Sequence, residues 1–324
     1  MMTDGFPYKD IPERINISMA HHYCGQQMQE LFERSPLPIR PITMHLLSAP
    51  GKGVRSSLLF CAAMDREGFV PKEAIAAATA VEIFHLATLV HDDVIDEADT
   101  RRGIQSVQNK FGKKEAILCG DYLFGLAFVA IAEIYEPYGD CVKTFAKTVS
   151  KICLGELRQH RNNFNRDIHL YDYLRTIYGK TAALFYLSGY GGGLLGGASP
   201  KELRSLGEFG TYFGMVFQIV DDCKDYILKD KEALKPTLSD IGCGVVNLPL
   251  LMAYLKEPTL RKAPFTLELI QDVQRLDGVG DALNIARKYE KKGKRLLDGL
   301  ENKEQSLKLE ALMTQVFQPL KVRK

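Results

Sequence analysis

The sequence predicts an all-α fold, a single helical bundle, on two observations. Apolar residues recur at three- and four-residue spacings over most of the 324 residues, and no stretch alternates apolar and polar residues as a half-buried strand would. Short turns rich in Pro and Gly, such as PLPIRP at 36–41 and EPYGD at 136–140, separate these stretches without a low-complexity linker. We therefore expect one domain over residues 1–324.

The same spacing places the helices in chain order. We expect them at 15–34, 72–98, 113–135, 139–164, 170–195, 200–228, 266–276, 279–300 and 303–317. The stretch 228–250, LKDKEALKPTLSDIGCGVVNLPL, mixes Lys, Asp, Pro and Gly, which predicts a long loop of the kind that often carries function. The glycine-rich stretch 189–199 predicts close helix packing followed by a turn.

Composition narrows the class of protein. The 42 basic and 40 acidic residues nearly cancel, so nucleic acid is not expected as a partner. The seven cysteines are scattered and never form a CxxC pair, which favours a reducing compartment. No secretion signal is expected at the N-terminus, and the longest apolar run carries Glu82 and His85, so we expect a cytoplasmic protein without a transmembrane segment.

An acidic cluster follows the apolar stretch AIAAATAVEIFHLATLV. In HDDVIDEADTRRG, residues 91–103, Asp92, Asp93 and Asp96 occupy helical positions i, i+1 and i+4, so Asp92 and Asp96 share a face. Two like charges near 4 Å repel by about 4 kcal/mol at an effective dielectric of about 20, so a helix that keeps them needs cations. For one such cluster, a solvated helix end is an equally good interpretation.

A second cluster has the same spacing. VFQIVDDCKDY supplies Asp221, Asp222 and Asp225, again after an apolar helical stretch. Carboxylate oxygens suit a hard ion, and Mg²⁺ takes few protein carboxylates while completing its shell with water and substrate phosphates. The repeated cluster therefore predicts Mg²⁺ and a phosphorylated substrate.

These residues resemble the trans-type isoprenyl diphosphate synthases, in particular geranylgeranyl and longer-chain members. The family's two aspartate-rich motifs correspond to DDVIDEADTRR and FQIVDDCKD, and GDYLFGLAF at 120–128 and YGKTAALF at 178–185 also match. Together the motifs cover about residues 45–255. The resemblance implies a helical fold around a large central cavity, with the two Asp clusters facing each other across its mouth.

The resemblance also implies the reaction. Mg²⁺ ions and Lys180 withdraw charge from an allylic diphosphate, which can be dimethylallyl, geranyl or farnesyl diphosphate. Isopentenyl diphosphate then attacks the allylic cation and loses a proton, so the chain is expected to be a prenyltransferase. The resemblance further implies a homodimer. Residues 120–135 are an apolar helix face suited to that contact.

Matching positions carry the family's residue roles to this chain. Lys52, Arg55, His85 and Arg102 are expected to bind isopentenyl diphosphate, and Arg101 the allylic diphosphate. Thr181 and Gln218 are expected to face the cation, and Asp92 and Asp221 complete the catalytic set with Lys180. Alternatively, the arginine pair ends a helix that Gly103 caps, and His85 is a core side chain.

Two motifs depart from the family pattern. GGKRxRP is replaced by residues 50–56, PGKGVRS, so Gly53 stands for an arginine and Ser56 for the proline. The later loop keeps Lys235, a further expected substrate-binding residue, but has Val245 and Asn247 in place of a lysine and a threonine. A positive charge is therefore missing, unless another base such as those in the C-terminal LKVRK replaces it.

The expected length of the prenyl product depends on the residues that precede the first Asp cluster on its helix. Ala87 and Thr88 lie roughly 6 to 7.5 Å down the helix from Asp92, and both are small. Phe84, at roughly 12 Å, is the next candidate for the floor of the cavity. We expect a product of about C20 or longer, although an apolar stripe of this kind is also typical of plain core.

Other functions fit less well. A terpene cyclase would share one Asp cluster but not the second one or the arginine pair, and His160 and His169 offer no ligand set for a phosphohydrolase built on His91. A nucleotide loop around Lys180 would need glycine where Leu174 stands. A prenyl-diphosphate-binding subunit of a two-component synthase and a shorter-chain farnesyl diphosphate synthase remain alternatives.

Overall fold

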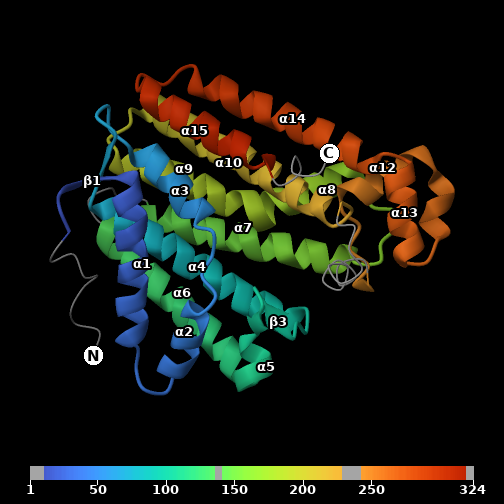
Figure 1. Ribbon diagram of the computed structural model, residues 1–324, viewed down its shortest axis with the longest axis horizontal. Coiled ribbons are helices and arrows are strands. Elements are labelled where there is room, and N and C mark those ends of the chain that lie inside the picture. The colour runs from blue at the N-terminus through green and yellow to red at the C-terminus, as the bar shows by residue number, and fades with distance from the viewer. Residues whose placement is uncertain (1–10, 136–140, 228–241, 319–324) are drawn as a thin grey trace. The chain divides into compact units, whose positions relative to one another are not determined.

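The computed structural model describes residues 11–135, 141–227 and 242–318 (Figure 1). Helices dominate, which confirms the all-α class, and the strands in the described part form only two short antiparallel pairs. The chain divides into two compact units. The first comprises Met1–Ala146 and Tyr190–Pro200, and the second comprises Lys147–Gly189 and Lys201–Lys324.

The first unit holds the N-terminal helices and both strand pairs. In chain order they are β1 (Arg14–Asn16), α1 (Ile17–Glu33), α2 (Arg40–Leu47), α3 (Val54–Ala63), β2 (Phe69–Pro71), α4 (Glu73–Ile95), β3 (Thr100–Arg101), β4 (Ile104–Gln105), α5 (Val107–Phe111) and α6 (Lys113–Tyr135). β1 pairs with β2, with Ile15 opposite Val70, and the Asn16 side chain caps α1 by accepting from Met19 N at 2.9 Å.

Helix α4 is the core of this unit. Ala74, Ala76, Ala77, Ala78 and Ala80 have no exposed surface, as expected of a helix that is apolar on all sides. It packs along α6 and also contacts α1 and α3 (Figure 1, teal and green for α4 and α6). By length and composition both α4 and α6 could cross a membrane, but a buried core helix passes the same test, and 67% of the α4 segment is buried in the protein.

The second unit holds the remaining helices. They are α7 (Cys141–Asn162), which begins in the first unit, α8 (Leu170–Ile177), the π-helical turn η2 (Tyr178–Ala182), α9 (Ala183–Leu195), which ends in the first unit, α10 (Pro200–Lys224), α12 (Leu248–Lys256), the 3₁₀ turn η3 (Pro258–Lys262), α13 (Leu267–Arg275), α14 (Gly278–Leu297) and α15 (Lys303–Gln315). Helix α12 packs on α13 and α14, and α14 packs on α15.

Glycines let backbones approach closely, as the stretch 189–199 predicts. In the first unit, a Cβ at Gly192 would lie 2.3 Å from the carbonyl oxygen of Leu59 on α3. In the second unit, a Cβ at Gly189 would lie 2.3 Å from Leu206 O, and one at Gly210 2.2 Å from Phe185 O. The expected close packing is confirmed, and Gly197, with φ of +72°, forms the turn that follows.

Several helices differ from the expected ones. The expected helix 170–195 is divided by the π-helical turn η2, and the expected helix 72–98 ends at Ile95. Helices α2, α3, α5 and α12 were not expected, because each is short and because prolines stand at the start of α2 and α12. Proline breaks a helix interior but suits a first turn, so these prolines begin helices and do not merely separate them.

We predict that Gly192→Ala destabilises the protein, because its methyl group would overlap a backbone carbonyl that has no room to move. The expected loss in free energy of unfolding is about 1–3 kcal/mol, measured by chemical denaturation. Gly25→Ala, on α1, is the matched control, because a Cβ there would have no neighbouring atom within 4 Å. It should stabilise the protein by about 0.5–1 kcal/mol, and equal effects from both variants would contradict the packing described.

Candidate active site

The first Asp cluster lies at the C-terminal end of α4. Asp92 and Asp93 are in its last turn, and Asp96 is the C-cap, whose N–H donates to Asp92 O at 2.8 Å. The negative end of the helix dipole disfavours carboxylates there by about 0.3–1 kcal/mol each. No basic residue occupies this last turn. The placement costs stability. Ligand binding therefore explains it better than a solvated helix end that binds no ligand.

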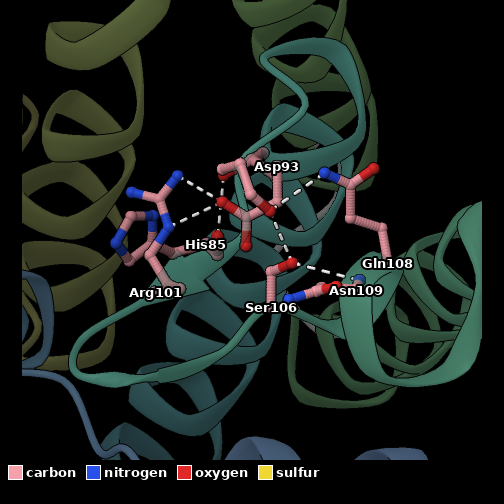
Figure 2. Close-up of polar contacts among 8 residues, drawn as sticks. His85, Asp93, Arg101, Ser106, Gln108 and Asn109 are labelled. Carbon is pink, nitrogen blue, oxygen red and sulfur yellow. Dashed lines mark hydrogen bonds and ion pairs between the residues drawn. The ribbon is translucent and has the colours of Figure 1, made fainter. Parts of the chain in front are cut away.

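Asp93 is paired with Arg101. Its side chain is 4% exposed and accepts from Arg101 Nε at 2.7 Å and from Nη2 (Figure 2). Burial raises the pKa of the Asp93 carboxyl, and Arg101 opposes that rise. The guanidinium therefore keeps a buried carboxylate ionised beside the two more exposed members of the cluster.

Arg101 and Arg102 lie on a β-hairpin and not in the last turn of a helix, so the alternative in which they end a helix capped by Gly103 is wrong. β3 and β4 flank Arg102 and Gly103, whose φ values are +51° and +82°. Positive φ at both central residues is typical of a type I′ turn, and it is strained for arginine. Ser106 Oγ and Gln108 Nε2 hold the hairpin by donating to Ala98 O at 2.6 and 2.9 Å (Figure 2).

A cavity of about 240 Å³ lies in the first unit beside this hairpin. Its lining includes Lys52, Glu82, His85 and Arg102, with His21 and Cys24 from α1. Arg102 donates to Ala49 O at 3.0 Å, and its guanidinium lies against Gly51, where a Cβ would be 3.1 Å from both terminal nitrogens. The cavity thus combines several of the expected substrate-binding residues.

His85 is surrounded by arginines. Burial, together with the positive charges of Arg55, Arg102 and Arg101, lowers the pKa of His85 well below 6.5. At neutral pH it is an uncharged imidazole that can donate one N–H to a ligand. A half-buried histidine among three guanidinium groups differs from a packed core side chain, which supports the expected phosphate contact.

The departures at Gly53 and Ser56 have structural consequences. Gly53 is the N-cap of α3 and adopts φ of +61°, a conformation that favours glycine. Ser56 donates its backbone N–H to Glu82 Oε1 at 3.0 Å. Proline, the family residue at this position, has no N–H to donate, so Glu82 and Ser56 form a contact that the family motif lacks.

The second Asp cluster repeats the placement of the first. Asp221 and Asp222 are in the last turn of α10, and Asp225 follows its last residue, Lys224. Lys224 Nζ contacts Asp221 Oδ1 at 2.8 Å, and the Asp221 side chain is 53% exposed. Both clusters therefore occupy the same position on their helices, with carboxylates at the unfavourable end of the dipole.

A hydrogen-bonded chain runs from the second cluster to two other expected site residues. Tyr173 donates its hydroxyl to Asp222 Oδ2 at 2.6 Å, and Gln218 Nε2 donates to Asp222 Oδ1 at 2.8 Å. Thr181 Oγ1 donates to Gln218 Oε1 at 2.6 Å. Burial and the Asp222 charge raise the pKa of Tyr173 well above 10, so it remains a donor.

Lys180 lies in the π-helical turn η2, and such turns are frequent at functional sites. Its Nζ pairs with Glu156 on α7 at 2.9 Å. The backbones meet because Gly155 and Gly179 lack side chains: a Cβ at Gly155 would be 2.3 Å from Lys180 N. Glu156 and Tyr173 were not expected from the sequence, since each acts through a contact with a distant residue.

The remaining expected residues are placed as follows. Phe84 is 1% exposed and packs on Phe124 and Phe145, with ring centroids 5.0 and 5.3 Å apart. Ala87 is buried, and the Thr88 hydroxyl donates within its own helix to His85 O at 2.7 Å.

In the loop that differs from the family pattern, Val245 and Asn247 stand in place of a lysine and a threonine. Lys235 lies outside the described residues. Asn247 is buried, begins α12 and accepts from the Tyr226 hydroxyl at 2.7 Å. Asn247 therefore has a structural contact, while Val245 supplies an apolar side chain where the family has a lysine.

The Asp clusters suit a metal ion that binds together with a ligand. Among residues 11–135, 141–227 and 242–318, no three His, Cys, Asp or Glu side chains form a ready ligand set. Asp96 and Asp221 are nevertheless exposed carboxylates, and Mg²⁺ uses one or two such groups with substrate phosphates and water. The donors present therefore fit Mg²⁺ in company with a diphosphate.

Comparison with known proteins places this geometry in context. A sequence model of the polyprenyl synthetase family matches residues 38–275. Component 2 of heptaprenyl diphosphate synthase from Geobacillus stearothermophilus is 36% identical over 273 residues, covering 81% of this chain and 84% of that protein.

Solved structures agree over nearly the whole chain. The heptaprenyl diphosphate synthase of Staphylococcus aureus has a TM-score of 0.84 at 28% identity, covering 93% of this chain and 98% of that one. A polyprenyl synthase of Caulobacter crescentus, solved with calcium and isoprenyl diphosphate, has a TM-score of 0.79 at 25% identity, covering 93% of each chain.

We predict that a comparison of Arg102→Gly with Arg102→Ala distinguishes the backbone strain at position 102 from the role of its guanidinium in substrate binding. Both remove the guanidinium from the cavity, so both should weaken substrate binding equally. Only glycine relieves the positive φ, and the Gly variant should be more stable than the Ala variant by about 0.5–1 kcal/mol in chemical denaturation. An alanine variant that is the more stable of the two would contradict a strained hairpin.

We predict that His85 makes stability depend on pH. Its pKa is depressed in the folded protein, so below pH 6.5 the unfolded chain binds a proton that the folded chain does not. Stability is therefore fully present above pH 6.5 and falls as the pH drops, by up to about 1.4 kcal/mol per unit. In denaturation between pH 5.5 and 7.5, His85→Gln should reduce this slope, whereas replacing the exposed His22 by Gln should not.

Proposed function

We infer that this chain, which belongs to the polyprenyl synthetase family, is a prenyltransferase. It condenses isopentenyl diphosphate head to tail with an allylic diphosphate and gives an all-trans prenyl diphosphate of about C20 or longer. One observation carries this inference. In one compact unit, a helix end that bears carboxylates is paired through Asp93 and Arg101 with the hairpin whose Arg102 lines a cavity together with Lys52 and His85.

The proposal extends to the metal and the setting of the reaction. Mg²⁺ would be held at each Asp cluster, by Asp92, Asp93 and Asp96 in the first unit and by Asp221, Asp222 and Asp225 in the second. Bound there, it would supply positive charge to the diphosphate that leaves the allylic substrate. The Caulobacter crescentus polyprenyl synthase, solved with calcium and isoprenyl diphosphate, supports the binding of a divalent cation together with a diphosphate. We also propose a cytoplasmic protein.

Different basic residues of the chain are proposed to bind the two substrates. Lys52, Arg55, His85 and Arg102 would bind isopentenyl diphosphate, with His85 as an uncharged donor and the arginines as cations. Arg101 would bind the allylic diphosphate while it remains in contact with Asp93, and Lys235 would assist. Positive charge aimed at the leaving group favours ionisation more as negative charge develops there.

Lys180, Thr181 and Gln218 are proposed to act at the reacting carbons. Glu156 orients Lys180 toward the departing diphosphate. Thr181 gives its proton to Gln218, so its oxygen lone pairs are available to stabilise the allylic cation. The double bond of isopentenyl diphosphate then attacks this cation, and the proton lost from the adduct goes to the departing diphosphate.

We propose that the protein is a homodimer. On α6, Ile117, Leu118 and Val129 are large apolar residues that are 45–56% exposed. An exposed apolar face of this kind marks an interaction surface. A second copy of the chain is the proposed partner.

The experiment that tests the function uses the purified chain by itself. It is incubated with Mg²⁺, labelled isopentenyl diphosphate and dimethylallyl, geranyl or farnesyl diphosphate, and the dephosphorylated products are sized by chromatography. Products of about C20 or longer are expected, with at least about a hundredfold loss in Asp92→Ala. Asp99→Ala, at an exposed carboxylate outside both clusters, should keep the activity.

A second candidate is a subunit that binds prenyl diphosphate but turns over only with a partner protein. The relative named as component 2 of heptaprenyl diphosphate synthase favours it, as do the uncharged residues Gly53 and Val245. Failure to incorporate label with every allylic primer, together with retained diphosphate binding, would support this candidate over the first.

We predict that Phe84→Ala lengthens the product if Phe84 is the floor of the cavity. Removing the ring opens space within its cluster with Phe124 and Phe145 and should cost about 3–5 kcal/mol in stability. Phe209→Ala, at a fully buried phenylalanine of α10, is the control for a similar stability loss without lengthening. Unchanged product length in a folded Phe84→Ala variant would remove Phe84 as the floor.

A further inference from the structure

The cavity of the first unit has a wall that the family motifs do not supply. Helix α1 contributes His21 and Cys24 to the lining shared by Lys52, His85 and Arg102. Residues 17–33 precede the matched segment, which begins at residue 38. The residues of this wall therefore lie outside the segment that the family model matches.

His21 is held in place at this wall. Its ring packs edge-on against Phe60 on α3, with centroids 5.0 Å apart and planes at 87°. His21 Nε2 lies 3.2 Å from Ser57 Oγ, which itself donates to Gly53 O at 2.7 Å. Because a hydroxyl has one proton to give, Ser57 accepts from the Nε2–H of His21. In the neutral ring, Nδ1 is then the nitrogen that can take up a further proton.

His21 lies beside the position where the family motif has an arginine. A Cβ at Gly53 would be 3.8 Å from Nδ1 and 3.9 Å from Cε1 of His21. The Nδ1 edge of the imidazole therefore borders the space in which a side chain at position 53 would begin. Gly53 supplies no charge there, and a protonated His21 would supply one.

The charges around His21 suit a protonation that accompanies ligand binding. Burial lowers the pKa of His21 below 6.5 and the Glu82 carboxylate of α4 raises it, with a net lowering. The other charged or titratable groups of the same lining are Lys52, Arg102, His85 and the buried thiol of Cys24, whose pKa is raised to about 12. A diphosphate among these cations would bring negative charge beside the ring and favour its protonated form.

We propose that His21 is a further diphosphate-binding residue of this cavity, which donates from Nδ1 and supplies the positive charge that Gly53 lacks. The proposal rests on the proposed function, in that the ligand is the diphosphate of the isopentenyl substrate. It adds to the site a residue from a helix outside the matched segment.

The test compares His21→Gln with His22→Gln. Glutamine at 21 keeps a donor for Ser57 but cannot become charged, and His22 is exposed on the same helix and does not line the cavity. The KM for isopentenyl diphosphate, the KM for the allylic substrate and kcat are measured between pH 6 and 8.5. Isopentenyl diphosphate binding is also measured by calorimetry in buffers of different ionisation enthalpy, which reports proton uptake.

We expect His21→Gln to raise the KM for isopentenyl diphosphate about tenfold at pH 6, the loss of one charge-assisted hydrogen bond. The ratio of the variant's KM to the wild-type KM should approach one at pH 8.5. Because both proteins bind the same substrate, protonation of the substrate itself affects both KM values equally and cancels in this ratio. The allylic KM and kcat should change less than twofold, and proton uptake should fall relative to wild type. His22→Gln should match wild type throughout.

A second variant keeps the test informative if His21→Gln does not fold. His21→Lys retains a charge at every pH, so its KM for isopentenyl diphosphate should equal that of wild type at pH 6 and be lower at pH 8.5. An unchanged KM in the Gln variant, an equal loss at every pH, or a Lys variant that binds more weakly throughout would overturn the proposal. Absence of isopentenyl diphosphate binding by wild type would instead overturn the proposed function, and this proposal with it.

Discussion

Six carboxylates at the C-terminal ends of two helices are the constraint on which the rest of the site depends. In each helix two aspartates occupy the last turn and a third follows, where the dipole disfavours negative charge. In the first unit the cost is offset by Arg101, which reaches Asp93 from a hairpin whose turn places Arg102 at a positive φ. The strained turn is therefore explained by what it positions.

The same cations determine the state of the neighbouring groups. Arg55, Arg101 and Arg102 act with burial to keep His85 uncharged. The Glu82 carboxylate of the cavity lining opposes the lowering of the Arg102 pKa by burial. The site thus has one face of negative charge and one of positive charge, joined by the Asp93–Arg101 pair. A metal ion and a diphosphate are the ligands that complement these two faces.

In the second unit, Lys224 pairs with Asp221, and neutral donors hydrogen-bond Asp222. Tyr173 and Gln218 donate to Asp222, and Thr181 donates to Gln218, so the aspartate is connected to the residues proposed to face the cation. Lys180 depends on a different device, a π-helical turn packed through Gly155 and Gly179 against α7. Neutral donors therefore hold Asp222, whereas Lys180 is held by close backbone packing and by its ion pair with Glu156.

Sequence reasoning succeeded where the signal is local. The long apolar periodicity of α4, α6 and α10 predicts these helices closely, and the spacing of the aspartates predicts their common place at two helix ends. It failed for the hairpin, since strands of two residues have no period, and for α2 and α12, whose prolines lie in the first turn. Tyr173, Glu156 and His21 gave no signal, because each acquires its role from a partner far along the chain.

The most direct test of the account measures Mg²⁺ and an unreactive farnesyl diphosphate analogue binding to the chain by calorimetry, each with and without the other. If the carboxylates hold the metal together with the diphosphate, each ligand should tighten the other by the same factor, and Asp221→Asn should reduce that coupling. Analogue binding of equal affinity in Mg²⁺ and in chelator would contradict the account.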